Sequence, residues 1–138
     1  MSRGARLFVA FATGLAALGG PVARAQAPPS PAPQYLPFSE FPADDSEAQR
    51  SARQAYNDAV DRYNKALYDY HVTLAQINQL ADVHNSPTAT PAERDKARAD
   101  AVPLRTKLDA LRRDVNGLVA GVDQARRKAS QAGVTVTR

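Results

Sequence analysis

The chain contains no cysteine, no tryptophan and only one methionine among its 138 residues. Without cysteine, neither a disulfide framework nor a zinc site built from thiolates is possible. Long apolar runs are scarce as well, since the run from Leu7 to Leu18 has 12 residues and a membrane-spanning helix takes about 20. A chain of this length holds one small domain, whose stability must come from packing.

Sequence signatures of catalysis are also missing. The chain has no glycine-rich phosphate loop, no G-x-S-x-G nucleophile turn and no H-E-x-x-H zinc motif. Its two histidines, His71 and His84, have no carboxylate three or four residues away, which is the spacing that helical metal ligands use. We therefore expect a protein that is not an enzyme and that binds no metal or cofactor.

Residues 1–27 are typical of a secretory signal peptide. Arg3 and Arg6 precede the apolar run, and an A-x-A cleavage site follows at residues 25–27, with an alternative site two residues earlier. Cleavage there predicts a mature chain that begins near Pro28 and has no transmembrane span. The composition of the signal is of a bacterial type, so the expected location is periplasmic or secreted.

Six prolines lie within residues 28–43, which removes amide donors and favours extended backbone over helix. We expect this segment to be a flexible stalk that the fold does not need. It nevertheless carries three rings, Tyr35, Phe38 and Phe41, within seven residues. These rings either fold back and shield the end of the first helix or present a short motif to a protein partner.

A four-three repeat of apolar residues predicts a long helix over residues 44–84. Asp44 or Asp45 is the expected N-cap, in capping-box register with Glu47. The repeat stops before a proline, so residues 85–89 form a turn. Two columns of side chains share one face of this helix: Val60, Leu67, Leu74 and Ala81 at position a, and Tyr56, Tyr63, Tyr70 and Ile77 at position d.

A second repeat predicts another helix over residues 90–132. Its start is well marked, because Thr90 suits the N-cap, Pro91 suits the first turn and Glu93 completes a capping box. Pro103 lies inside the repeat without changing its phase. We therefore expect a kink within one helix rather than two separate helices.

The short turn between the two predicted helices determines the fold class. About five residues force the second helix to return antiparallel to the first. The chain is predicted to be all-α, a long antiparallel two-helix coiled-coil hairpin preceded by the signal peptide and the Pro-rich extended segment. Residues 133–138 have strand propensity without a partner strand, and we expect them to be frayed.

The two predicted helices carry opposite net charge. Residues 40–84 hold eight acids and four bases, whereas residues 90–138 hold six acids and eleven bases. Removing the three arginines of the signal peptide from the 18 basic residues leaves 15 against 14 acids, and this balance predicts no binding to nucleic acid. Antiparallel pairing also predicts contacts between polar side chains and arginines: Asn64, His71 and Asn78 with Arg112, Arg105 and Arg98.

The apolar face of the first helix is wider than one partner helix covers, because Ala59, Ala66 and Leu80 extend it to three positions in seven. A second copy is the simplest cover, so we expect a homodimer in which Ala59 and Ala66 allow close approach. The tyrosines of position d either lie across the seam with their hydroxyls at its edge or form an open strip that grips another protein. The second helix has a strip of small residues that is either only tolerated or receives rings or a neighbouring helix: Gly117, Gly121 and Ala125.

These features favour a role in protein binding. We expect an exported coiled-coil structural or interaction module of the bacterial envelope, which binds a protein partner through its helical faces or its aromatic stalk. The alternative is a periplasmic holdase chaperone that binds unfolded or membrane-bound clients. The helices are loosely similar to the helical arms of such chaperones, although the strand-forming core through which those proteins trimerise has no counterpart here.

Overall fold

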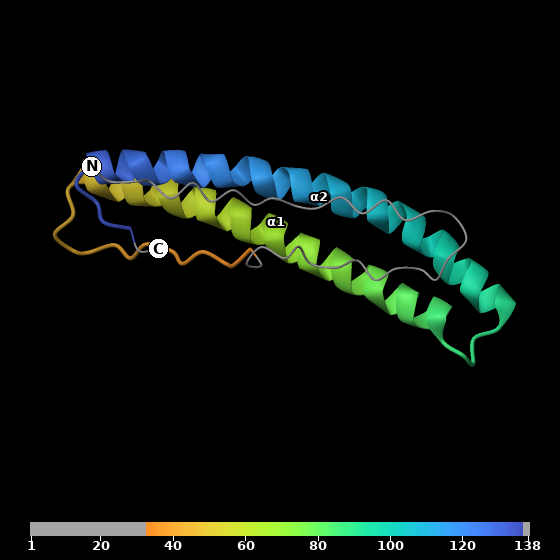
Figure 1. Ribbon diagram of the computed structural model, residues 1–138. Helices are drawn as coiled ribbons and strands as arrows, with labels where there is room; N and C mark the ends of the chain where they lie inside the picture. The colour runs from red at the N-terminus through yellow and green to blue at the C-terminus, as the bar shows by residue number, and fades with distance from the viewer. Residues whose placement is uncertain (1–32, 137–138) are drawn as a thin grey trace, which may run out of the picture.

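The computed structural model describes residues 33–136, in which two helices pack against each other. The first, α1, spans Glu47–Asn85, and the second, α2, spans Pro91–Gln131. Figure 1 shows them side by side and antiparallel, joined by a tight turn. The predicted all-helical fold is confirmed for this range. The signal peptide predicted for residues 1–27 lies outside the described residues, as do residues 28–32 of the proline-rich segment.

The start of α1 differs from the prediction. Ser46 is its N-cap, so a cap at Asp44 or Asp45 is wrong. The Ser46 hydroxyl accepts a hydrogen bond from the backbone amide of Gln49, and the Gln49 side chain accepts one from the backbone amide of Ser46. These two bonds complete a capping box. Asp45 has another partner, because its carboxylate pairs with the guanidinium of Arg53, about two turns further on. It therefore faces the side of the helix and not the free amides at its start.

α2 begins as predicted and continues through its internal proline. Thr90 is the N-cap, and its capping box with Glu93 forms in both directions. Pro103 lies on the exposed side of an uninterrupted helix. The carbonyl that it leaves without a partner is therefore near the surface, where water can satisfy it. Ala101 and Leu104 keep inward positions on either side of it, so the prediction of one helix is confirmed.

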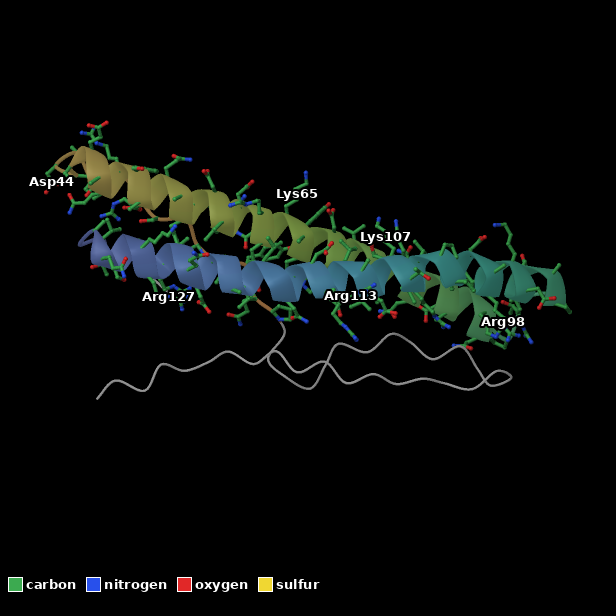
Figure 2. All side chains as sticks on the ribbon, turned by 90° about the horizontal axis from the view of Figure 1, so that it is seen from above. Asp44, Lys65, Arg98, Lys107, Arg113 and Arg127 are labelled. Atoms are coloured by element: carbon green, nitrogen blue, oxygen red, sulfur yellow. The ribbon has the colours of Figure 1, made fainter. Side chains whose placement is uncertain are left out.

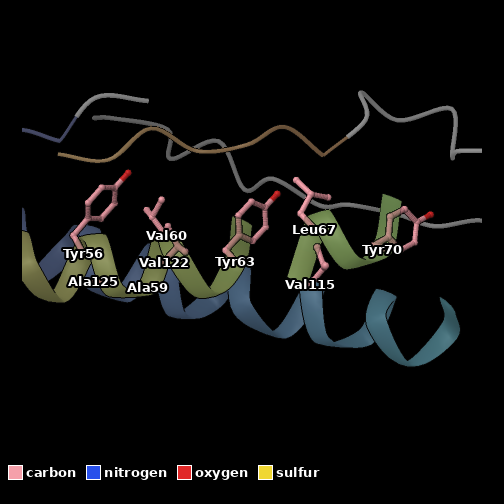
Figure 3. Packing of buried hydrophobic residues seen from close by; sticks show 9 residues of the cluster. All are labelled: Tyr56, Ala59, Val60, Tyr63, Leu67, Tyr70, Val115, Val122 and Ala125. Carbon is pink, nitrogen blue, oxygen red and sulfur yellow. The ribbon is translucent and has the colours of Figure 1, made fainter. Parts of the chain in front are cut away.

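The core lies along the seam between the helices and includes the tyrosines of α1. Val60, Leu67 and Ile77 are fully buried. Tyr56, Tyr63 and Tyr70 are also buried, so they form no open strip on the surface. In Figure 3 the hydroxyls of Tyr56 and Tyr63 point toward the side where the proline-rich segment runs. A third segment of the chain therefore covers the tyrosines, in addition to α2.

The end of α2 is ordered where fraying was expected. Gly133 has a φ of +75°, and its amide donates to the Ser130 carbonyl at 3.1 Å. The Val134 amide donates to the Ala129 carbonyl at 2.9 Å, and these two bonds make a Schellman motif. Val134 is only 2 % exposed. For residues 133–136 the expected fraying is therefore wrong, because this apolar side chain has the core to pack against.

The proline-rich segment differs most from the prediction. Residues 33–45, which we call the strap, run back along the first half of α1 in an extended conformation (Figure 1). A flexible stalk was predicted because prolines cannot form helix or sheet hydrogen bonds with one another. Side chains of α1 supply those bonds to the strap, so the prediction of a flexible stalk is wrong for the part of the segment that the structure describes.

Candidate functional site

The strap is bound to α1 through its main chain. Asn64 donates from Nδ2 to the Leu36 carbonyl at 2.9 Å and accepts the Leu36 amide on Oδ1 at 2.8 Å. Asn57 makes the same pair of bonds with Ser39, at 2.8 and 2.7 Å. Each asparagine thus exchanges a donor and an acceptor with one residue, as a neighbouring strand does in a sheet.

The spacing of these contacts explains why both form together. Asn57 and Asn64 are seven residues apart, and two turns of helix advance by about 10.5 Å. Leu36 and Ser39 are three residues apart, and an extended chain advances by about 10 Å over that interval. The two repeats match, so an extended segment can follow the heptad of α1 without strain. Leu36 also packs against the core cluster, a role that no sequence signal had assigned to it.

Arg53 fixes the end of the strap that leads into α1. Its guanidinium pairs with Asp45 and also donates from Nη1 to the Ser39 hydroxyl at 2.8 Å. The Asp45 amide closes the turn by donating to the Pro42 carbonyl at 3.3 Å. Both charged side chains are almost fully buried. Removing either partner would leave the other charge buried and unpaired, which is strongly destabilising.

The outer edge of the strap carries the three rings that the sequence analysis singled out. Tyr35, Phe38 and Phe41 are 53, 55 and 47 % exposed. Their three-residue spacing places them on one edge of an extended chain, while Leu36 and Ser39 occupy the edge that faces α1. The segment thus folds back onto the helix, as the first alternative predicted, but its rings stay at the surface. Presentation of these rings to a protein partner stays a prediction. We call these three rings the aromatic row.

Two further features border the aromatic row. The Tyr35 ring lies 6.3 Å from the His71 ring between centroids, and His71 in turn makes an edge contact with Tyr70. At the other end, Phe41 lines an open hollow of about 560 Å³ together with side chains of the first turns of α1: Glu47, Arg50, Ser51 and Gln54.

Buried tyrosines of α1 lie under the strap and beside its first described residues. Burial raises the pKa of Tyr63 and that of Tyr70 above the usual value of 10.0. At Tyr70, Arg112 opposes this increase and Asp109 adds to it. The Tyr56 hydroxyl is buried and has no hydrogen-bond partner among the described residues.

Polar side chains of α1 that were predicted to contact arginines of α2 have other neighbours in the structure. Asn64, expected near Arg112, pairs with the strap. His71 packs against two tyrosine rings. The Asn78 Oδ1 atom is buried without a hydrogen-bond partner in the described part of the chain. The strap therefore occupies a position beside Asn64 where a side chain of α2 was predicted.

The residues proposed for dimerisation do not form one free face. Ala59 is buried, Ala66 packs against the core cluster of its own chain, and Leu80 is half-buried. Ala59 instead lines an open groove of about 360 Å³ between the helices, together with Gly117 and Gly121. A Cβ atom added at either glycine would meet nothing within 4 Å. Packing of the hairpin itself therefore does not require these glycines.

The rest of the surface of residues 33–136 carries many charged side chains. Figure 2 shows Lys65, Lys107 and Arg113 projecting from the outside of the hairpin. Among residues 33–136, no three His, Cys, Asp or Glu side chains lie close enough together to hold a metal ion. Neither helix in this range is both long and apolar enough to cross a membrane.

Comparison of the chain with protein-family models, curated proteins and solved structures gives no significant match. The strap, the aromatic row and the groove between the helices are therefore the features from which a function can be proposed.

Proposed function

We propose that the protein is an exported coiled-coil interaction module of the bacterial envelope, which binds a protein partner through the aromatic row. The supporting observation is that Tyr35, Phe38 and Phe41 stay about half exposed on a strap that is itself bound to α1. Rings held in place lose little conformational freedom on binding, whereas rings on a flexible tail would lose much more. Aromatic side chains are also the residues that most often dominate the energy of protein interfaces.

Charge around the aromatic row indicates the chemistry of the partner. The strap carries three acids, Glu40, Asp44 and Asp45, and no base. Asp45 is paired internally, whereas Glu40 and Asp44 are exposed on either side of Phe41. The partner surface is therefore apolar with basic residues at its margin, because such a surface complements both the rings and the two carboxylates.

The proposed location depends on residues 1–27, which have the pattern of a secretory signal. Export would place the mature chain in the periplasm or the medium. Edman sequencing or mass spectrometry of the exported protein tests this part alone, and an N-terminus at or near Pro28 is expected.

Capture of a partner from envelope extract tests the role of the aromatic row. The variant carries Tyr35→Ser, Phe38→Ser and Phe41→Ser together, and the matched control is Tyr68→Ser, a ring on α1 that is 59 % exposed and outside the strap. We expect the parent and the control to retain one stoichiometric partner and the triple variant to lose it. A triple variant that retains the partner would exclude the aromatic row as the site. Retention of many unfolded proteins by all three would favour the holdase alternative.

A further inference from the structure

The strap covers a groove that is suited to main chain. Its floor is formed by Tyr56 and Tyr63, and its rim by Asn57 and Asn64; we call this the strap groove. Both asparagines bind main-chain atoms, so they select an extended conformation and not a particular sequence. Side chains of the strap add specific contacts at a few positions: Tyr35 with His71, Leu36 with the core, and Ser39 and Asp45 with Arg53.

The strap does not satisfy all the polar groups of this face. Tyr56 is 1 % exposed, and its hydroxyl has no hydrogen-bond partner in the described range. Buried polar groups without partners are rare and costly, so an occupant that bonded to this hydroxyl would bind more tightly than the strap does.

We propose that the strap groove is a binding site for an extended segment of a partner protein, and that the strap occupies this site in the free protein. The occupant pairs its main chain with Asn57 and Asn64 and places an apolar side chain where Leu36 lies. It also brings a hydrogen-bonding group to the Tyr56 hydroxyl. The strap of a second copy is not this occupant, because it would bring the same atoms and leave Tyr56 without a partner.

The strap groove and the aromatic row belong to different states of the molecule. When the strap leaves the groove, the three rings leave the hairpin with it. A test of the groove must therefore avoid the rings. A fluorescent peptide with the sequence of residues 33–45, in which serine replaces the three aromatic residues, reports on the groove alone, so that failure of the aromatic-row proposal does not affect the result.

The first measurement compares the binding of this peptide to the full-length parent and to Leu36→Asp, whose own strap is weakened. A tethered strap competes at an effective concentration in the millimolar range, which a micromolar peptide cannot match. We expect the peptide to bind Leu36→Asp at least tenfold more tightly than the parent, as measured by fluorescence anisotropy. Arg53→Ala, which releases the other end of the strap, serves as a second loosened variant if circular dichroism shows that Leu36→Asp has lost helix.

The second measurement identifies the groove as the binding site. Adding Asn57→Ala and Asn64→Ala to the loosened variant should weaken peptide binding at least tenfold, whereas Asn116→Ala, on the exposed side of α2, should leave it unchanged. A set of peptides with single substitutions near the Ser39 position is then compared with the starting peptide. At least one should bind the loosened variant tenfold more tightly than the starting peptide does, and it should lose this gain when the protein also carries Tyr56→Phe. Equal binding to the parent and the loosened variants, indifference to Asn57 and Asn64, or no gain that depends on Tyr56 would each overturn the proposal.

Discussion

Replacing Asn64 with alanine tests whether the strap contributes to the stability of the hairpin. The substitution removes a side chain that both donates to and accepts from the main chain of Leu36. A net hydrogen bond contributes about 1 kcal/mol, so the two bonds together contribute about 2 kcal/mol. Alanine has the higher helix propensity, which returns up to about 0.7 kcal/mol. The expected net loss in the free energy of unfolding is therefore about 1 to 2 kcal/mol.

The matched control separates these two terms. Asn116 lies exposed on α2, and Asn116→Ala has the same gain in helix propensity without the loss of a strap contact. Urea unfolding followed by circular dichroism gives the free energy of each variant. In a domain of about 100 residues, 1 kcal/mol changes the melting temperature by roughly 4–8 °C, so Asn64→Ala should melt well below the control.

The double variant adds a test of cooperativity. If Asn57 and Asn64 hold one strap, the first substitution already loosens what the second would release, so the combined loss should be smaller than the sum of the single losses. If Asn64→Ala is as stable as Asn116→Ala, the strap is not bound in solution. The proline-rich segment would then be the flexible stalk that the sequence predicts.

Three further predictions follow from the helices. Gly133→Ala should lower the free energy of unfolding by about 1 kcal/mol because φ is positive at this residue. Gly121→Ala should raise it by about 1 kcal/mol because an added Cβ atom meets nothing there. Urea unfolding that shows changes of the same sign for both variants would contradict this. Pro103→Ala should raise the free energy of unfolding by up to about 3 kcal/mol, and a lower melting temperature would show that native packing needs a proline-induced bend. Burial raises the pKa of Tyr63 and Tyr70, because the folded protein disfavours their ionised form. The two neutral tyrosines therefore contribute their full stability below pH 10.0, and this contribution is lost as the pH rises above that value. Melting temperatures between pH 9 and 11.5 should therefore fall less steeply when both are replaced by phenylalanine.

The hairpin was predictable because its signals are local or periodic. The a and d columns follow from spacing alone, and the Thr90 capping box lies within four residues. The strap escaped prediction because its partners are distant, with 28 residues between Leu36 and Asn64 and 18 between Ser39 and Asn57. A signal was nevertheless present, since asparagines seven residues apart on a helix match an interval of three residues in an extended chain.

The candidate site was only partly predictable for the same reason. The density of rings in a proline-rich segment identified Tyr35, Phe38 and Phe41 without any tertiary information. The alternatives for the tyrosines of α1 could not be decided from the sequence, because burial of Tyr56 depends on a segment that appeared too rich in proline to pack. The cap of α1 was misassigned at Asp45 because Arg53 attracts that carboxylate across two turns of helix.

The homodimer stays a prediction, and the packing of the described residues bears on the reason given for it. A homodimer was predicted because Ala59, Ala66 and Leu80 made the apolar face of the first helix too wide for one partner helix. Within a single chain, Ala59 is buried, and Leu36 of the strap and Val136 of the tail join the packing around the core cluster. The extra width of the apolar face is thus covered within one chain, and Ala66→Lys would damage the hairpin whether or not it dimerises.

The informative measurement is the melting temperature of the parent over a hundredfold range of protein concentration. This temperature should stay constant if the strap and the tail cover the whole apolar face of α1. A melting temperature that rises with concentration would require a second copy on a surface that remains open, and the groove beside Gly117 and Gly121 would be the first to test with a bulky substitution.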